Sequence, residues 1–277
     1  FLEIKDYLTK KKISFKTNSD TEVAVNAFMY FGEKAFNYFD GMWSIAIYDI
    51  KEKTCFLSRD YAGQKPLYYS LQKNYFLFSS QLNGIFQDNN LIKNISKKNL
   101  KKYFAYSYVP APETIYENIY QVNSGEIIKI ESNTLKITKK KFWELNNGPD
   151  YNLFFHKENK DEFVNNFNKL IKQHYISDKK PVLALSGGID SNIILNSLIN
   201  EKKEPNCFTL GFDNKSFDES DRVENIKGNF TKNIFKTNKK QIQKRFKPNI
   251  DFLQSVQVET PFLCDRQNIS QISSENR

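Results

Sequence analysis

One short run in this chain has the residue types needed to bind phosphate, Ser186-Gly187-Gly188-Ile189-Asp190-Ser191. Residues 181–185 are apolar and predict a strand before it, while the apolar periodicity of residues 192–198 predicts a helix after it. A helix N-terminus has unpaired N–H groups and partial positive charge, which favour an anion. Glycines let the backbone close around that anion because they lack a Cβ. The serine hydroxyls can donate hydrogen bonds and Asp190 can hold Mg²⁺, so we expect the run to bind the pyrophosphate moiety of ATP.

An ordinary turn is the alternative for this run, because Ser-Gly-Gly is common in turns and Asp or Ser often caps a helix. The complete order of strand, Ser-Gly-Gly, Asp-Ser and helix favours a nucleotide. The sequence contains neither G-x-x-x-x-G-K-S/T nor G-x-G-x-x-G, which excludes the two best-known nucleotide loops. The run resembles the pyrophosphate loop of the ATP pyrophosphatases, enzymes that cleave ATP between its α and β phosphates.

Composition excludes several other classes of protein. The net charge of +9 comes mostly from scattered lysines without a recognition motif, so we interpret it as a solvated surface and expect no nucleic-acid partner. The three cysteines, Cys55, Cys207 and Cys264, form no Cys-x-x-Cys pair, which argues against zinc and against a disulfide framework. No apolar stretch approaches the roughly 20 residues of a membrane span. We therefore expect a cytoplasmic enzyme without a membrane partner.

The pattern of elements predicts two domains joined by a linker. Residues 1–145 read as an α+β domain with antiparallel sheets and helices, including hairpin strands 66–71 and 75–79. Residues 146–160 are polar and irregular, which is typical of a linker. Residues 161–277 read as an α/β domain with a parallel sheet. Its expected elements are a helix at 163–174, a strand at 181–186, a helix at 190–200, a strand at 206–212 and a helix at 218–229.

The first half carries four ordered patches that identify a family. They are Ser19-Asp20-Thr21-Glu22-Val23, residues 39–49 (FDGMWSIAIYD), residues 58–69 (SRDYAGQKPLYY) and Phe78-Ser79-Ser80-Gln81. They resemble the class II glutaminase domain of glutamine-hydrolysing asparagine synthetases. Residues 108–116, 123–126, 211–212 and 217–220 look like later segments of the same family. The resemblance covers nearly the whole chain.

The resemblance implies a fold and a mechanism. An amidotransferase domain would release ammonia from glutamine through an N-terminal cysteine. A Rossmann-like ATP-pyrophosphatase domain would use ATP and Mg²⁺ to convert aspartate to an acyl-adenylate, which ammonia would turn into asparagine, leaving AMP and pyrophosphate. Asp20 would bind the α-amino group of glutamine, although a helix cap is its alternative role. Leu185 and Leu210 match positions whose backbone contacts adenosine in the family, and strand burial explains them equally well. A homodimer is left open.

Several departures keep the substrate open. The N-terminal cysteine and the family's acidic segment beyond residue 277 are absent, so we expect a piece that lacks both chain ends and is inactive alone. Gln81 replaces the usual Glu, and Thr260 replaces an acidic residue. The alternative function is therefore amidation of another carboxylate, such as a sugar acid in surface polysaccharide synthesis. A non-catalytic binding protein is a third hypothesis, which the intact Ser186–Ser191 run disfavours.

Overall fold

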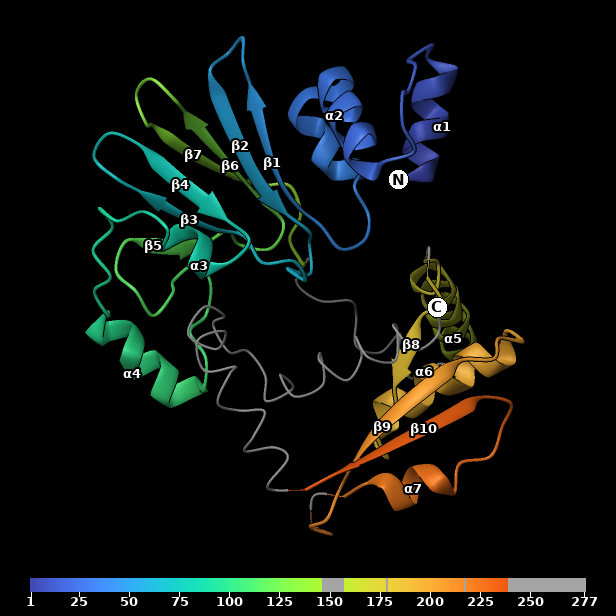
Figure 1. Cartoon of the computed structure of the whole chain (residues 1–277). Coiled ribbons are helices and arrows are strands. Elements are labelled where there is room, and N and C mark those ends of the chain that lie inside the picture. The colour runs from blue at the N-terminus through green and yellow to red at the C-terminus, as the bar shows by residue number, and fades with distance from the viewer. Residues whose placement is uncertain (146–156, 178, 217, 239–277) are drawn as a thin grey trace. The chain divides into compact units, whose positions relative to one another are not determined.

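The computed structural model describes residues 1–145, 157–177, 179–216 and 218–238, which fall into two compact units (Figure 1). The first unit contains residues 1–145 and the second contains the described residues from 157 onward. We describe each unit by itself. Within these ranges, no helix combines the length and the apolar character that crossing a membrane requires.

The first unit contains two antiparallel sheets and several helices, which confirms the predicted α+β pattern. The larger sheet has the strand order β1-β2-β6-β7, and the smaller has the order β4-β3-β5. The elements are α1 (Leu2–Lys10), α2 (Asp20–Phe31), the 3₁₀ helix η1 (Gly32–Tyr38), β1 (Ser44–Asp49), β2 (Thr54–Arg59), β3 (Tyr68–Leu71), β4 (Phe76–Ser79), α3 (Leu82–Ile85), α4 (Lys97–Tyr106), β5 (Ile119–Gln121), β6 (Glu126–Glu131) and β7 (Ile137–Lys141).

The alternation of side chains along the strands explains how the layers of this unit form. Neighbouring strand residues point to opposite faces of a sheet. Leu57 of β2 is fully buried and shares a core with Tyr69 of β3, so the two sheets pack face to face. The adjacent Phe56 points the other way and packs against Phe36 of η1. Tyr68 lies on the outer face of the smaller sheet and packs against α3. The order of layers is therefore helix, sheet, sheet, helix.

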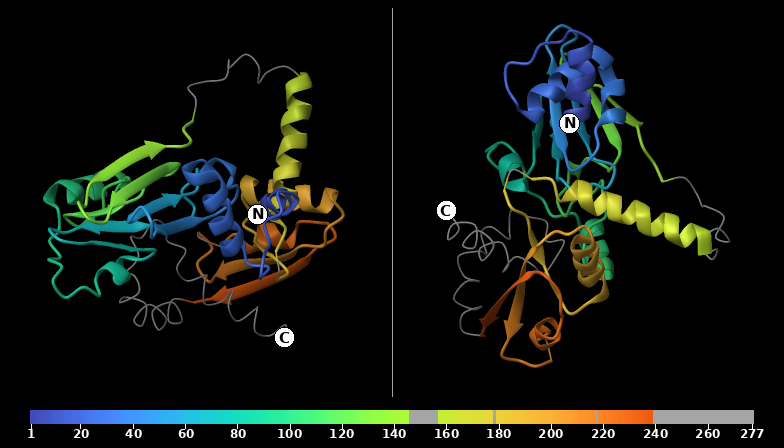
Figure 2. Two further views of the ribbon diagram at one scale, coloured as in Figure 1. Left: turned by 90° about the horizontal axis from the view of Figure 1, so that it is seen from above. Right: turned by 90° about the vertical axis from the view of Figure 1, so that its right-hand side faces the viewer.

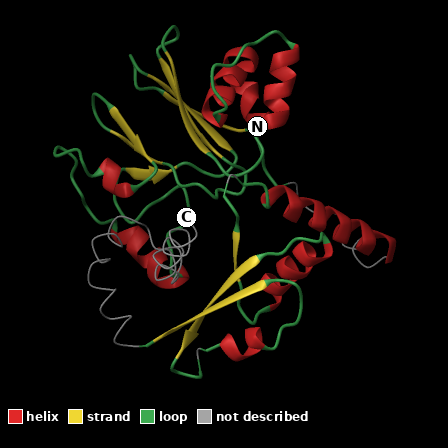
Figure 3. Cartoon of the chain, turned by 45° about the vertical axis from the view of Figure 1, so that its right-hand side comes forward, coloured by secondary structure: helices red, strands yellow, loops and turns green. Residues whose placement is uncertain are grey.

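Helices α1 and α2 form a pair in the outer helical layer (Figure 3). Leu8 and Ala27 are both fully buried in the core that the two helices share. Ser19 caps α2, because its side chain accepts a hydrogen bond from the N–H of Thr21 at 3.2 Å. Asp20 is thus the first residue of the helix and not its cap, which leaves the Asp20 side chain available for another role.

The second unit contains a parallel sheet, as predicted. The strand order is β10-β9-β8, and both neighbouring pairs are parallel (Figure 2). Its core joins Leu185, Leu195 of α6, Cys207 of β9 and Val223 of α7. The elements are α5 (Lys157–His174), β8 (Val182–Ala184), α6 (Ile189–Asn200), β9 (Asn206–Phe212), α7 (Ser220–Glu224) and β10 (Thr231–Thr237).

Several elements of this unit differ from the prediction. Strand β8 covers Val182–Ala184 and not 181–186, and α6 begins at Ile189 and not at residue 190. Helix α5 begins at Lys157, earlier than the predicted residue 163. Helix α7 covers only Ser220–Glu224 where 218–229 was predicted, and the φ of +151° at Gly228 excludes a helix that continues to 229. Strand β10 was not predicted at all. Among the described strands it lies at one edge of its sheet, and its side chains are mostly exposed, so its sequence lacks the apolar run of a central strand.

Candidate functional site

The Ser-Gly-Gly loop leaves the carboxyl end of a parallel strand, where sheets of this kind bind ligands. Strand β8 ends at Ala184, and the N–H of Leu185 still bonds to the carbonyl of Phe208 in β9 at 2.9 Å. The chain then turns through the loop, and α6 begins at Ile189 with Gly188 as its N-cap residue. The structure therefore contains the predicted order of strand, loop and helix.

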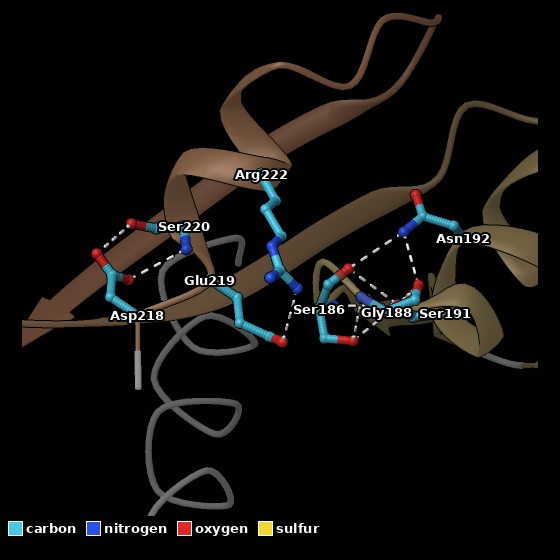
Figure 4. A network of polar contacts seen from close by, with 8 residues as sticks. All are labelled: Ser186, Gly188, Ser191, Asn192, Asp218, Glu219, Ser220 and Arg222. Carbon is cyan, nitrogen blue, oxygen red and sulfur yellow. Dashed lines mark hydrogen bonds and ion pairs between the residues drawn. The ribbon is translucent and has the colours of Figure 1, made fainter. Parts of the chain in front are cut away.

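Ser191 ties the loop to the first turn of α6. Its hydroxyl lies 3.1 Å from the N–H of Ser186, 3.0 Å from the carbonyl oxygen of Ser186 and 3.0 Å from the Ser186 hydroxyl. The side-chain amide of Asn192 donates to the carbonyl of Gly188 at 2.7 Å (Figure 4). These bonds fix the loop before any ligand arrives, which lowers the entropy lost on binding. The sequence motif predicted a role for both serines but none for Asn192.

Gly187 is required because another chain segment lies directly against it. A Cβ at this position would sit 2.6 Å from Cδ and 2.9 Å from Cβ of Arg222. Arg222 belongs to α7, which follows the carboxyl end of β9. Figure 4 shows its side chain extending toward the loop. The residue pattern of the loop does not indicate a contact with a distant segment, so the sequence did not predict Arg222 as a residue of the site.

Asp190 lies at the second helical position of α6 and is exposed. Among the described residues, none forms a hydrogen bond or an ion pair with its carboxylate, and none of their His, Cys, Asp and Glu side chains form a group of three able to hold a metal ion. Mg²⁺ commonly takes one or two carboxylates and completes its shell with phosphates and water. The carboxylate therefore suits a Mg²⁺ ion that a nucleotide brings with it.

Leu185 directly follows β8, Leu210 belongs to the neighbouring β9, and the two residues differ in burial. Leu185 is 2 % exposed and packs in the core of the unit, whereas Leu210 is half-buried. The Leu185 N–H bonds to Phe208, and its carbonyl accepts the hydroxyl of Thr209 at 2.7 Å. A carbonyl has a second lone pair, so the hydrogen bond from Thr209 leaves the Leu185 carbonyl one further acceptor position.

Asp218 shapes the segment beyond β9, next to the loop. It accepts hydrogen bonds from the Ser220 N–H at 3.1 Å, the Ser220 hydroxyl at 3.0 Å and the Phe212 N–H at 3.3 Å. Donation from the Ser220 N–H, then from its hydroxyl, lowers the pKa of Asp218 below its ordinary value. An Asp two residues before a Ser at a helix start is a turn signal, which could have revealed this role from the sequence.

A hollow of about 630 Å³ in the first unit contains the other predicted site residue, Asp20. Its wall is of mixed polarity and comes mainly from α2, β1 and the segment before β1, with charged groups at Asp20, Asp40 and Lys65. Asp20 is exposed, and the Thr21 hydroxyl donates to it at 3.4 Å. An exposed carboxylate in a hollow with both polar and apolar walls suits a small ligand with an ammonium group.

Asp60 positions two residues that line this hollow. It is fully buried and accepts N–H bonds from Trp43 at 3.2 Å, Gln64 at 2.9 Å and Lys65 at 3.1 Å. Burial of a carboxylate costs free energy unless hydrogen bonds replace those it made with water, and the three N–H donors supply these bonds. The bonds hold the start of β1 and the loop after β2 together, so Asp60 organises the wall of the hollow.

Neither Cys55 nor Cys207 has the environment of a nucleophile. Burial raises the pKa of each thiol from the ordinary value of 9.0 to about 11. The folded state favours the protonated thiol and thereby gains free energy of unfolding. This gain is complete below pH 9.0 and is lost as the pH rises through about 11. Cys264 lies outside the described residues.

We therefore expect Cys55 and Cys207 in a Cys264→Ser variant of residues 1–277 to react with a thiol reagent at pH 8 only after denaturation. The rate of labelling, measured with and without urea, checks this. Rapid labelling of the native protein at pH 8 would contradict the burial of both thiols.

Comparison with known proteins matches both units. Residues 1–143 match the family described as Glutamine amidotransferase domain, and residues 163–245 match the family described as Asparagine synthase. A Methanocaldococcus jannaschii protein assigned the name asparagine synthetase 2 (glutamine-hydrolyzing) is 31 % identical over 232 residues, which cover 81 % of this chain and 43 % of that protein.

A second relative is also named as a glutamine-hydrolyzing asparagine synthetase. Asparagine synthetase 1 (glutamine-hydrolyzing) of Bacillus subtilis is 29 % identical over 225 residues, which cover 80 % of this chain and 34 % of that protein. The chain thus spans less than half the length of these relatives. The first unit matches the amidotransferase family and the second matches the asparagine synthase family. The chain therefore belongs to the family of glutamine-hydrolysing asparagine synthetases.

Proposed function

We propose that the protein transfers ammonia from glutamine to aspartate, forming asparagine at the expense of ATP. The observation that carries this proposal is the prearranged Ser186–Ser191 loop at the carboxyl end of β8, in a chain that also contains an amidotransferase-type domain. The proposed boundaries are 1–145 for the amidotransferase domain, 146–160 for the linker and 161–277 for the synthetase domain. We assign the second domain to the Rossmann-like ATP pyrophosphatases.

The loop residues have distinct proposed roles. Ser186, Gly187, Gly188 and Ser191 bind the pyrophosphate moiety of ATP through N–H groups and hydroxyls, aided by the positive end of α6. ATP supplies the adenylyl group that activates the acceptor carboxylate for attack by ammonia. Asp190 would hold Mg²⁺, which neutralises phosphate charge when bound. The backbone of Leu185 and Leu210 is proposed to face adenosine. A cytoplasmic location and a homodimer stay predictions.

The test of this function is product formation by the full-length gene product. With glutamine, Mg²⁺ and ATP present, aspartate should stimulate release of AMP and pyrophosphate, and asparagine should appear in equal amount. Other carboxylates, including sugar acids, are assayed in parallel. Release of AMP with a sugar acid but not with aspartate would support the alternative acceptor, and formation of ADP instead of AMP would contradict the proposed chemistry.

Asp20 provides a test of the glutamine site. An Asp20→Asn change removes the negative charge that the glutamine ammonium would contact, so the KM for glutamine should rise roughly 100-fold while the activity with free ammonia is unchanged. The matched control is Asp6→Asn, since Asp6 is an exposed residue of α1 whose partner is Lys10. An unchanged KM in Asp20→Asn would remove Asp20 from the site.

A further inference from the structure

Arg222 is a cation placed against the proposed ATP loop, and it lies outside the Ser186–Ser191 motif. Its Cβ, Cγ and Cδ lie 2.9, 3.3 and 2.6 Å from the position that a Cβ would occupy at Gly187. The stem of the side chain therefore crosses the backbone of the loop in direct contact. The close-up shows the guanidinium beyond this crossing, between Glu219 and Ser186 (Figure 4).

The guanidinium has a weak partner that a ligand can replace. The Arg222 Nη1 lies 3.6 Å from Oε1 of Glu219, beyond hydrogen-bond distance. The side chains are 70 % and 45 % exposed respectively. Exposed ion pairs contribute little to stability, because water screens both charges. A phosphate can accept two parallel hydrogen bonds from a guanidinium, which is a stronger interaction than this pair.

The loop needs such a cation. Residues 186–192 contain a single formal charge, the negative carboxylate of Asp190. The hydroxyls and N–H groups of the loop are neutral donors, so by themselves they cannot balance the several negative charges of a triphosphate. A cation held at the loop offsets that charge and favours binding.

We propose that Arg222 is a phosphate-binding residue of the ATP site, and that Glu219 holds its guanidinium near the loop until the phosphates of the nucleotide replace the carboxylate. This inference rests on the proposed function, since it assigns the polyphosphate as the ligand of the loop. Arg222 should therefore contact the phosphates of the nucleotide and should not contact adenosine. Glu219 is then a competitor of the nucleotide.

The experiment measures ligand binding by the full-length gene product, with calorimetry and three probes. The probes are α,β-methylene-ATP, inorganic pyrophosphate and adenosine. Arg222→Gln keeps the stem that covers Gly187 but removes the charge, so the Kd for the first two probes should rise about tenfold. Arg222→Lys should restore part of this loss. The Kd for adenosine should not change.

Lys227→Gln is the matched control, because it removes one exposed lysine a short way beyond α7. It should leave all three Kd values unchanged, which separates a local contact from a general effect of charge. Glu219→Gln should tighten binding of α,β-methylene-ATP about twofold, in Mg²⁺ and in EDTA alike. Thermal unfolding of each variant verifies that the second unit remains folded.

Three results would overturn the inference. An unchanged Kd in Arg222→Gln, with a weakened Kd in Ser191→Ala, would remove Arg222 from the site and leave the proposed function standing. Weaker binding in Glu219→Gln in Mg²⁺ but not in EDTA would show that Glu219 is a metal ligand and not a competitor. If the unaltered protein bound neither α,β-methylene-ATP nor pyrophosphate, the proposed function would fail together with the inference.

Discussion

Replacing Asp190 with asparagine is expected to lower ATP-dependent AMP formation by the full-length gene product about 100-fold or more, since a charge that stabilises the reacting phosphates is lost. Asp190→Asn preserves the size of the side chain. Among the described residues the carboxylate has no hydrogen-bond or ion-pair partner, so the fold should not change. A pyrophosphate-release assay at saturating ATP and aspartate gives the rate.

Two controls make this result specific to the ATP site. Asp221→Asn changes another exposed carboxylate in the same unit, at the first turn of α7, and should retain the full rate. Hydrolysis of glutamine by Asp190→Asn should also be retained. If AMP formation by Asp190→Asn equalled that of the unaltered protein, Asp190 would not be the proposed Mg²⁺ ligand.

Replacing Asp60 with asparagine is expected to destabilise the first unit by about 3 kcal/mol, since an unsatisfied buried donor costs roughly 1–3 kcal/mol. The two carboxylate oxygens accept N–H bonds from Trp43, Gln64 and Lys65. An asparagine side chain has one acceptor oxygen, so its amide group must face at least one of these donors. Urea unfolding followed by tryptophan fluorescence measures the change.

For a chain of residues 1–277 the fluorescence reports the first unit, because both tryptophans of this sequence, Trp43 and Trp143, belong to it. Asp40→Asn is the matched control: Asp40 is exposed, its side chain accepts one bond, from the Gly41 N–H at 2.8 Å, and its loss should cost less than about 0.5 kcal/mol. Equal unfolding midpoints for Asp60→Asn and Asp40→Asn would contradict the organising role of Asp60.

Local pattern predicted most of the elements that build the two units. The strand at 206–212 has the bounds that its sequence predicted, because the hydrophobic pattern of a strand acts within a few positions. The same local reasoning missed β10 and extended α7 too far. Strand β10 exists because β9 offers it a parallel partner, and no property of residues 231–237 alone requires that pairing.

The sequence by itself determined the chemistry of the loop: two hydroxyls, two glycines and one carboxylate, between a strand and a helix. Residue type and spacing suffice there because all of these groups lie within one turn of the chain. The tertiary structure alone decided that Arg222 crosses Gly187 and that Asp60 joins the start of β1 to the loop after β2. Such contacts join segments far apart in the sequence, and they form only when the packing of sheet and helices brings those segments together.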